Sequence, residues 1–544
     1  MAVLNYLGNK KLKATGVKQP FTKHQISEII KCSNDIVYFV QKYMKIVNLD
    51  EGLIPFNLRK YQEKTLKSFV DNRNVICLFP RQSGKTVSYC AFILHSILFK
   101  DHYAIALLAN KAAVAREILS RVKLAYENLP LWLQQGVTEW NKGSIELENG
   151  SKAIAGATSD SSGRSGSFST LILDEFAFVP KNIADEFIKS ALPVISSGKT
   201  SKIIMVSTCN GMNQFYKFWT DAIKNLNNYV PIEVKWDEVP GRDEAWKVEM
   251  IRSFGAGGEE KFKQEFENDF FGSASKTLVD MSMLKKFADN YKQPISSKDC
   301  LDIYEEPKET HNYVMTVDTG RGTEDDYSAF VVFDLTANSI KVVAKYRNNE
   351  ILPNNYSAII YEIAKKYNDA HILVEINDIG GQVVDSLYHD YSYENIMMTS
   401  GDKKIFNRQN LVFSKKNAKF GIRTSKKVKQ VGCVELKNLI ENNILEIPDF
   451  DIISELGAFI QVKGSYEADS GFHDDLAMCL VLFGWLMAQR NFKELLDDPD
   501  KYAESKEEVA PFLLKGNPDE NMGENRFIAD GCVWEVVDNY DRKR

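Results

Sequence analysis

The sequence predicts an α/β protein of two domains, and three observations lead to this prediction. The chain has 544 residues, which is too long for a single hydrophobic core. Apolar strand-like segments alternate with helical segments over residues 56–271 and again over residues 311–496, as in sheets covered by helices. A polar, proline-containing stretch, 272–310, separates the two regions and is expected to be a hinge or linker. Residues 1–55 are expected to form an N-terminal helical segment, and residues 497–544 an acidic tail.

Composition narrows the class of protein. The longest apolar run, 476–488, is shorter than the roughly 20 residues that cross a bilayer, and the N-terminus lacks the apolar core of a signal peptide. The eight cysteines are scattered without a C-x-x-C pair, which argues against zinc sites and disulfides and for a reducing compartment. We therefore expect a cytoplasmic protein without a membrane partner.

The net charge of −6 is concentrated in the tail. Residues 497–544 carry 13 acidic and 7 basic residues, so the rest of the chain carries 61 of each sign. A neutral body can still bear a basic stripe, and nucleic acid is therefore not excluded as a partner.

A phosphate-binding loop is indicated at residues 79–86, "FPRQSGKT", although Phe79 stands where the P-loop pattern G-x-x-x-x-G-K-[ST] has its first glycine. The strand-like run "NVICLF" leads in and the helical run "TVSYCAFILHSILF" leads out, so backbone N–H groups at the helix start can hold phosphate oxygens. Lys85 would contact the β- and γ-phosphates, Thr86 would bind Mg²⁺, and Gly84 permits a close backbone approach. The alternative is a strand–turn–helix with an incidental G-K-T.

A second motif, "STLILDEFAF" at 169–178, supports ATP hydrolysis. At the end of this apolar strand, Asp174 would hold Mg²⁺ through its shell and Glu175 would orient and deprotonate the attacking water. The structural alternative is a strand edge capped by two acids. Arg81, inside the loop, could stabilise transition-state charge on the γ-phosphate or be a surface arginine. The strand "IIMVSTCNG", 203–211, ends in small polar residues that could sense the γ-phosphate or simply close a turn.

Acidic residues also stand at the ends of elements in the second region. Asp318 ends the run "NYVMTVD", Glu375 lies in "HILVEIND", and Asp474 and Asp475 open an apolar helix. Such carboxylates can converge in space and suit Mg²⁺ or Mn²⁺, and two ions about 3.5–4 Å apart could activate water and stabilise the leaving 3′-oxygen of a phosphodiester. Asp326, in "EDDYSAF", is a further candidate. Taken singly, each acid has a structural alternative: a turn cap, an ion pair or a helix N-cap.

A basic stretch lies between these acids in the sequence. "SKKNAKFGIRTSKKVKQ", residues 414–430, holds seven basic residues and no acid. Such a run is usually a solvated face or a loop, but beside a phosphodiester-cleaving site it is better interpreted as a surface that contacts the DNA backbone. It has no base-reading signature, so DNA binding without sequence preference is expected.

The combination of "LRKYQ" (58–62), "PRQSGKT", "LILDEFAF", "STCNG" and "FKQEFENDFF" resembles the large terminase subunit of tailed bacteriophages, most closely the T-even type. That family replaces the first P-loop glycine and carries an arginine in the loop, as Phe79 and Arg81 do here. The resemblance implies an N-terminal RecA-like P-loop ATPase domain and a C-terminal RNase H-like nuclease domain. The predicted order of three strands, a helix and a strand in the second region agrees with the latter.

The resemblance also implies a role for each matched residue. Gln62 would contact adenine, Thr208 would couple hydrolysis to movement, and Glu175 would be catalytic. The remaining nucleotide contacts would come from the loop and the magnesium-linked acid: Arg81 (acting in cis), Gln82, Ser83, Gly84, Lys85, Thr86 and Asp174. The nuclease metal ligands would be Asp318, Glu375 and Asp474, with Asp326 and Asp475 as further ligands. Of the neighbouring pair, Asp474 is the favoured principal ligand.

The function implied is a viral DNA-packaging motor that uses ATP and Mg²⁺ to pump double-stranded DNA into a procapsid and cuts the concatemer. Its implied partners are DNA, the portal protein, the small terminase subunit and further copies of itself on the portal, in the host cell cytoplasm. One alternative is a helicase–nuclease of repair or restriction, which would need a second RecA-like domain. Another is a structural packaging adaptor with an inactive nuclease, against which the intact set of acids argues.

Overall fold

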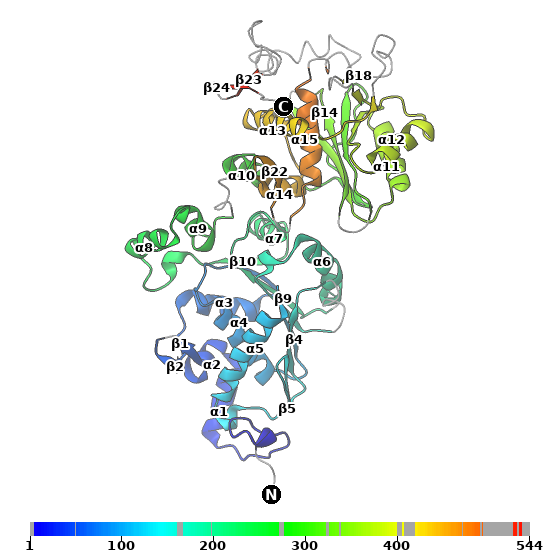
Figure 1. The fold of residues 1–544 in the computed structure, drawn as a ribbon. Coiled ribbons are helices and arrows are strands. Elements are labelled where there is room, and N and C mark those ends of the chain that lie inside the picture. The colour runs from blue at the N-terminus through cyan, green and yellow to red at the C-terminus, as the bar shows by residue number, and fades with distance from the viewer. Residues whose placement is uncertain are drawn as a thin grey trace, which may run out of the picture. The chain divides into compact units, whose positions relative to one another are not determined.

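The chain forms two compact units, Met1–Ser273 and Ala274–Arg544 (Figure 1). The computed structural model describes residues 5–48, 50–159, 167–196, 198–270, 277–322, 326–336, 339–399, 405–406, 419–469, 472–489, 492, 526–529 and 532–535. Across these residues, we find no helix with both the length and the apolar character needed to span a membrane.

The first unit is built on an eight-stranded sheet with the order β10-β3-β9-β8-β4-β7-β6-β5. The strands from β10 to β7 are parallel, and β6 and β5 continue the sheet antiparallel at one edge. The apolar runs predicted to be strands occupy its centre, where both faces are buried, as is typical of parallel sheets. The bounds are β3 (Asn74–Leu78), β4 (Ala104–Ala109), β5 (Val137–Trp140), β6 (Ser144–Leu147), β7 (Lys152–Ala157), β8 (Thr170–Asp174), β9 (Lys202–Ser207) and β10 (Val230–Glu233).

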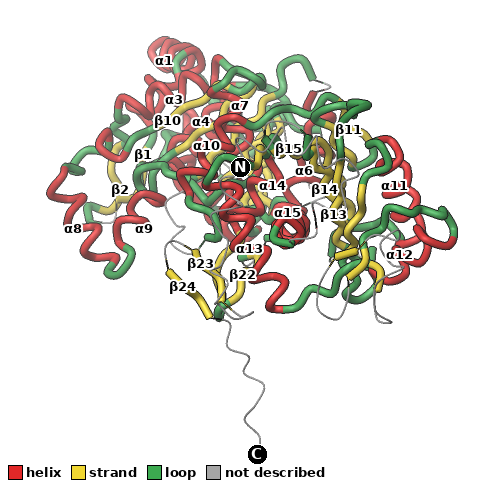
Figure 2. Tube along the Cα trace, turned by 90° about the horizontal axis from the view of Figure 1, so that it is seen from above, coloured by secondary structure: helices red, strands yellow, loops and turns green. Residues whose placement is uncertain are grey.

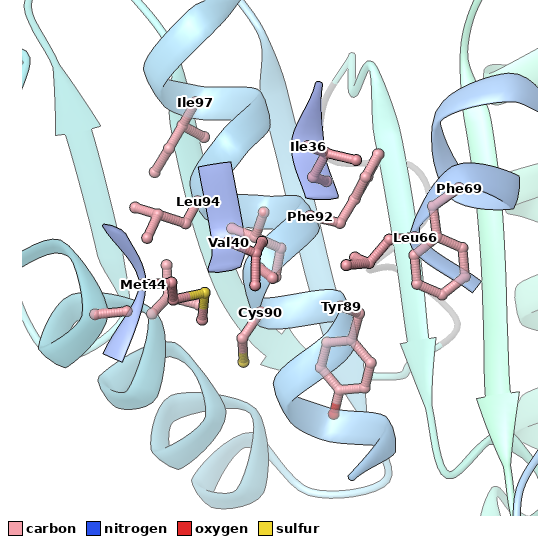
Figure 3. Packing of buried hydrophobic residues seen from close by; sticks show 14 of the residues in the cluster. Ile36, Val40, Met44, Leu66, Phe69, Tyr89, Cys90, Phe92, Leu94 and Ile97 are labelled. Atoms are coloured by element: carbon pink, nitrogen blue, oxygen red, sulfur yellow. The ribbon is translucent and has the colours of Figure 1, made fainter. Parts of the chain in front are cut away.

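Helix α4 (Lys85–Phe99) runs through the core of this unit and is buried over most of its circumference. Figure 3 shows Phe92, Leu94 and Ile97 of α4 among side chains from the N-terminal helices, such as Val40, and from α3, such as Leu66. The described part of the segment 1–55 therefore contributes to the core of the first unit. The other elements of the unit are α1 (Lys23–Asn34), α2 (Ile36–Tyr43), β1 (Lys45–Asn48), β2 (Gly52–Pro55), α3 (Lys60–Asp71), α5 (Ala112–Glu127), α6 (Lys181–Ser196), α7 (Gln214–Ile223), α8 (Glu244–Phe254) and α9 (Gly258–Glu265).

The second unit is built on a seven-stranded sheet with the order β11-β12-β15-β14-β13-β16, in which β20 also pairs with β15. Three consecutive antiparallel strands are followed by α11 and then by β16, which lies parallel to β13. This is the strand and helix order that the sequence predicted. The bounds are β11 (Ser296–Lys298), β12 (Leu301–Ile303), β13 (Tyr313–Asp318), β14 (Ser328–Asp334), β15 (Ile340–Asn348), α11 (Pro353–Lys366), β16 (His371–Val374) and β20 (Leu445–Glu446).

Helices cover both faces of this second sheet (Figure 2). The pair α11 and α12 packs on one face around Met315 and Phe330, and α15 packs on the other, where the Phe333 and Phe483 rings stack with centroids 3.9 Å apart. The sheet is thereby sealed from solvent except at its edges. The remaining elements are α12 (Gly380–His389), β17 (Met398–Thr399), β18 (Ile405–Phe406), β19 (Lys419–Phe420), α13 (Lys426–Glu441), α14 (Phe450–Ala458), β21 (Phe459–Val462), β22 (Ser465–Ala468), α15 (Asp475–Met487), β23 (Arg526–Ala529) and β24 (Cys532–Glu535).

The stretch that we expected to be a linker, 272–310, is folded where the structure describes it. Helix α10 (Met281–Asn290) packs on α14, and β12 pairs antiparallel with β15. Residues 277–310 therefore belong to the second unit. Within this stretch, β11 lies at the edge of the sheet and its three residues are all exposed.

Candidate active sites

The predicted phosphate loop connects β3 to α4 in the first unit. Gly84 stands at the N-cap of α4 with a φ of 85°, a left-handed conformation that favours glycine. The helix begins at Lys85, so its first backbone N–H groups face the loop. The geometry is that of an anion-binding helix start, as the motif predicted.

Side chains from outside the motif hold this loop in place. The hydroxyl of Tyr61 donates to the Ser83 carbonyl (2.6 Å), and Arg59 reaches the same oxygen (3.4 Å). Gln62, predicted to contact adenine, is buried and its amide donates to the Gly84 carbonyl (3.4 Å). The motif "LRKYQ" is thus a clamp on the loop, a role that spacing alone did not reveal.

The two acids at the end of β8 lie in different surroundings. Asp174 is buried, which raises the pKa of its carboxyl to about 6, and its Oδ1 atom has no hydrogen-bond partner among the described residues. Glu175 has a φ of 51°, and its carboxylate forms an ion pair with Lys85. Its second oxygen, Oε2, accepts from the Ser207 hydroxyl (3.3 Å) and from the backbone N–H of Thr208 (3.4 Å). The loop, the acids and the end of β9 therefore meet at one sheet edge, as expected for parallel strands.

Arg81 points away from these acids in this structure. Its side chain is 64% exposed and pairs with Glu265 (3.1 Å), while its backbone carbonyl accepts from Arg242 (2.9 Å). To act on a γ-phosphate, Arg81 would have to leave Glu265. No local pattern pointed to this partner, because Glu265 stands 184 residues away, in the motif "FKQEFENDFF".

The acids of the second unit gather at the carboxyl ends of β13 and β16. Asp318 ends β13, and Glu375 directly follows β16, its parallel neighbour. Burial, followed by the charges of Glu375, Asp475 and Asp326, raises the pKa of Asp318 well above its usual range. The amide of Asn377 donates to Glu375 (2.7 Å) and orients it. We call Asp318, Asp326, Glu375 and Asp475 the acid cluster.

The two neighbouring aspartates at the start of α15 lie in different surroundings. We expected Asp474 to be the principal ligand; its carboxylate lies 3.7 Å from Lys429, and Asp474 is not among the main groups that raise the pKa of Asp318. Asp475 is buried within the acid cluster, where burial and the nearby Glu455 charge raise its pKa to about 8. The geometry favours Asp475 because the first turn of α15 directs neighbouring side chains in different directions.

The acid cluster suits a divalent cation. Its donors are hard carboxylate oxygens, the ligands that Mg²⁺ prefers. Repulsion among these carboxylates adds to the effect of burial in raising the pKa of Asp318. A bound Mg²⁺ ion would relieve this repulsion. Within the described part of the chain, no group of three or more acidic, histidine or cysteine side chains already has the spacing of a bound ion. The acids fit the ion chemically, and their side chains would have to draw together around it.

The described part of the basic stretch runs directly beside this cluster. The backbone of Ile422 exchanges hydrogen bonds with Val374 and Ile376, on either side of Glu375 (2.8 Å each). Lys426 and Lys427 follow, exposed in the first turn of α13, where the helix dipole disfavours cations. The helix dipole therefore does not stabilise these two lysines. Residues 414–418 lie outside the described residues.

Two family models match the chain in sequence. Residues 76–274 match the large terminase subunit of the T4-like virus type, N-terminal region, and residues 315–483 match the terminase RNase H-like domain. The two matched regions coincide with the two sites just described. The chain therefore belongs to the large terminase subunits of the T4-like type, which are DNA-packaging ATPases that also carry a metal-dependent nuclease.

Solved structures show similarity at low sequence identity. The large terminase of bacteriophage HK97 is 14% identical with a TM-score of 0.47, over 83% of this chain and 99% of that one. A large terminase from a thermophilic bacteriophage, in complex with ADP, is 12% identical with a TM-score of 0.35, over 78% and 98%. The nuclease of thermophilic phage G20c with bound magnesium is 20% identical with a TM-score of 0.30, over 39% and 97%. The family assignment comes from the two family models.

Proposed function

We propose that the first unit hydrolyses ATP to translocate viral double-stranded DNA into a procapsid, and that the acid cluster of the second unit cuts the concatemer. The observation that carries this proposal is the presence of two separate acid-centred sites, one facing a phosphate loop and one beside exposed lysines. The cofactors are ATP and Mg²⁺. The proposed partners are DNA, the portal protein, the small terminase subunit and further copies of this chain, met in the host cytoplasm on the procapsid.

In the ATPase site, the position of each residue indicates its proposed role. Lys85 would bind the β- and γ-phosphates and Thr86 would hold Mg²⁺, backed by Asp174, whose buried Oδ1 atom has no hydrogen-bond partner among the described residues. Glu175 would take a proton from the attacking water. Because Ser207 and Thr208 contact the Glu175 carboxylate, a change at the γ-phosphate would reach β9 directly. Gln62 and Arg81 are proposed to bind adenine and to act on the γ-phosphate.

In the nuclease site, Asp318, Glu375 and Asp475 would hold the cation, with Asp326 at the exposed rim. Bound Mg²⁺ supplies charge that activates water and stabilises the leaving 3′-oxygen. The protein itself orients Glu375 through Asn377 and presents Lys426 and Lys427 to the DNA backbone.

Asp318→Asn separates the two activities. The substitution should abolish Mg²⁺-dependent plasmid cleavage and leave ATP hydrolysis intact, because Asp318 belongs only to the acid cluster. Cleavage at the wild-type rate would place the metal site elsewhere.

Packaging of linear DNA into purified empty heads, scored as ATP-dependent DNase protection, tests the motor. Protection should need ATP and Glu175 but not Asp318 when the DNA is already linear. An absence of protection, together with strand unwinding, would favour a helicase–nuclease. That alternative is disfavoured by the fold, because the central strands β13, β14 and β15 of the described second unit are antiparallel, unlike those of a second RecA-like sheet.

A further inference from the structure

A buried arginine lies directly behind the acid cluster. Arg347 stands near the end of β15, and its side chain is only 9% exposed. Its guanidinium lies 3.4 Å from Asp475 and 3.3 Å from Glu455, and it covers the ring of Tyr327 at 3.8 Å from the ring centroid. A guanidinium is planar and carries several donors, so it can bind two carboxylates and stack on a ring at once.

Glu455 ties this arginine to the helix that carries Asp475. While one of its oxygens faces Arg347, the other accepts from the backbone N–H groups of Leu476 (2.8 Å) and Ala477 (3.1 Å). Glu455 therefore caps α15 at the turn that presents Asp475. The result is a closed connection between β15, α14 and α15, which we call the Glu455–Arg347–Asp475 bridge.

The charges in the bridge suit a cation site. Glu455 neutralises Arg347, so the arginine can hold one oxygen of Asp475 without adding a net positive charge beside the cluster. Without Glu455, the full charge of Arg347 would compete with a metal ion for Asp475. Outer partners of this kind orient metal ligands and commonly affect metal affinity.

A neighbouring bridge provides an internal comparison. Lys345 lies two residues earlier on the same face of β15 and is also buried, where it pairs with Asp451, with Asp449 (2.7 Å) and with Asp302 (3.4 Å). Its partners lie outside the acid cluster. A buried ion pair is by itself weak evidence for stability. The two bridges differ in their contacts, because the bridge of Arg347 includes Asp475 of the acid cluster and the bridge of Lys345 includes no member of it.

We propose that Arg347 and Glu455 are positioning residues for the nuclease: the bridge holds Asp475 in the acid cluster and leaves its charge available to a divalent cation. This inference rests on the proposed nuclease function. It assigns to both residues an effect on cation binding that a purely structural bridge would not have.

The test uses the full chain without nucleotide and measures Mn²⁺ binding by calorimetry, with Asp318→Asn defining the binding that remains outside the acid cluster. Glu455→Gln keeps the size and a capping oxygen, and should weaken Mn²⁺ binding about tenfold, as loss of an outer partner commonly does. An unchanged affinity would overturn the proposal. If Asp318→Asn itself left Mn²⁺ binding unchanged, the proposed metal site would fail instead, so the two failures are distinguishable.

A second measurement follows the midpoint of thermal unfolding, Tm. Arg347→Met leaves Asp475 and Glu455 without their counter-charge, so Tm without metal should fall and saturating Mg²⁺ should raise it more than in the wild type. Arg347→Lys should restore part of the loss. The matched control, Lys345→Met, should lower Tm equally with and without Mg²⁺, and the same behaviour in Arg347→Met would show that the bridge is only structural. A far-ultraviolet circular dichroism spectrum like that of the wild type, together with a cooperative unfolding transition, confirms that each variant is folded.

Discussion

Replacing Glu175 by glutamine is expected to slow ATP hydrolysis and, at the same time, to tighten ATP binding. In this structure, the Glu175 carboxylate is the partner of Lys85, which must turn to the phosphates when ATP binds. Glutamine has nearly the same shape and keeps an oxygen for Ser207, but it carries no charge to hold Lys85 and cannot accept the proton of water. This one substitution therefore removes the general base and frees Lys85 to bind the phosphates of ATP.

The size of each effect follows from the geometry. Loss of a general base costs about 10²–10⁴ in rate. The side chains of Lys85 and Glu175 are 12% and 26% exposed, so their ion pair is only partly screened and is worth about 1 kcal/mol. Since ATP no longer has to break this pair, its affinity should rise about fivefold, which is the same free energy expressed as a ratio of dissociation constants.

Phosphate release gives the turnover number, and equilibrium titration with a fluorescent nucleotide gives the affinity. Asp185→Asn is a matched control, because Asp185 pairs with Lys181 in α6 (2.9 Å) and should change neither quantity. Unchanged turnover in Glu175→Gln would refute the base assignment. Weaker ATP binding would refute the idea that Glu175 restrains Lys85.

Three further predictions concern the nuclease unit. A methyl group on Gly380 would overlap a backbone carbonyl oxygen of the acid cluster, whereas one on Gly381 would meet nothing within 4 Å; Gly380→Ala should therefore lower Tm and abolish cleavage, while Gly381→Ala should keep both. The pKa of Asp475 is raised to about 8 in the folded protein, so without metal its contribution to stability is present at acidic pH and is lost as the pH rises toward 8. In the presence of a metal chelator, the Tm of Asp475→Asn should therefore rise relative to that of the wild type as the pH is raised from 5 to 8. An equal difference in Tm at both pH values would count against the raised pKa of Asp475. Reversing the charge of Lys426 and Lys427 should weaken DNA binding and lower the slope of its salt dependence by about 0.9 per lost phosphate contact, measured by fluorescence anisotropy; a slope equal to that of the wild type would exclude this surface.

Much of both sites could be predicted from the sequence because the acidic residues proposed to be catalytic lie at the ends of apolar strands. Asp174 and Glu175 follow one apolar run, and Asp318 and Glu375 end or follow two others. Neighbouring parallel strands bring their carboxyl ends to one edge, so residues far apart in sequence meet there without any knowledge of side-chain contacts. The roles of these residues stay predictions until the variants above are measured.

Some assignments depended on contacts that no local pattern encodes. The choice between Asp474 and Asp475 rests on which side of the first turn of α15 faces β13, and successive residues of a helix differ in direction by about 100°. The partner of Arg81 and the arginine behind Asp475 come from elements distant in the chain. The expected linker joined the second sheet because β12 pairs with β15 and β11 pairs with β12, although all three side chains of β11 are exposed and polar.

The sequence by itself therefore determined the two α/β units, the phosphate loop and the acids at the strand ends, because periodicity and motif spacing act within one element or between neighbouring strands. The tertiary structure alone decided which of two adjacent aspartates joins the acid cluster, what holds Arg81, and how Arg347 and Glu455 support the nuclease site. Those contacts depend on how separate elements pack face to face, and the pattern within one element fixes which face is buried but not which side chain lies opposite.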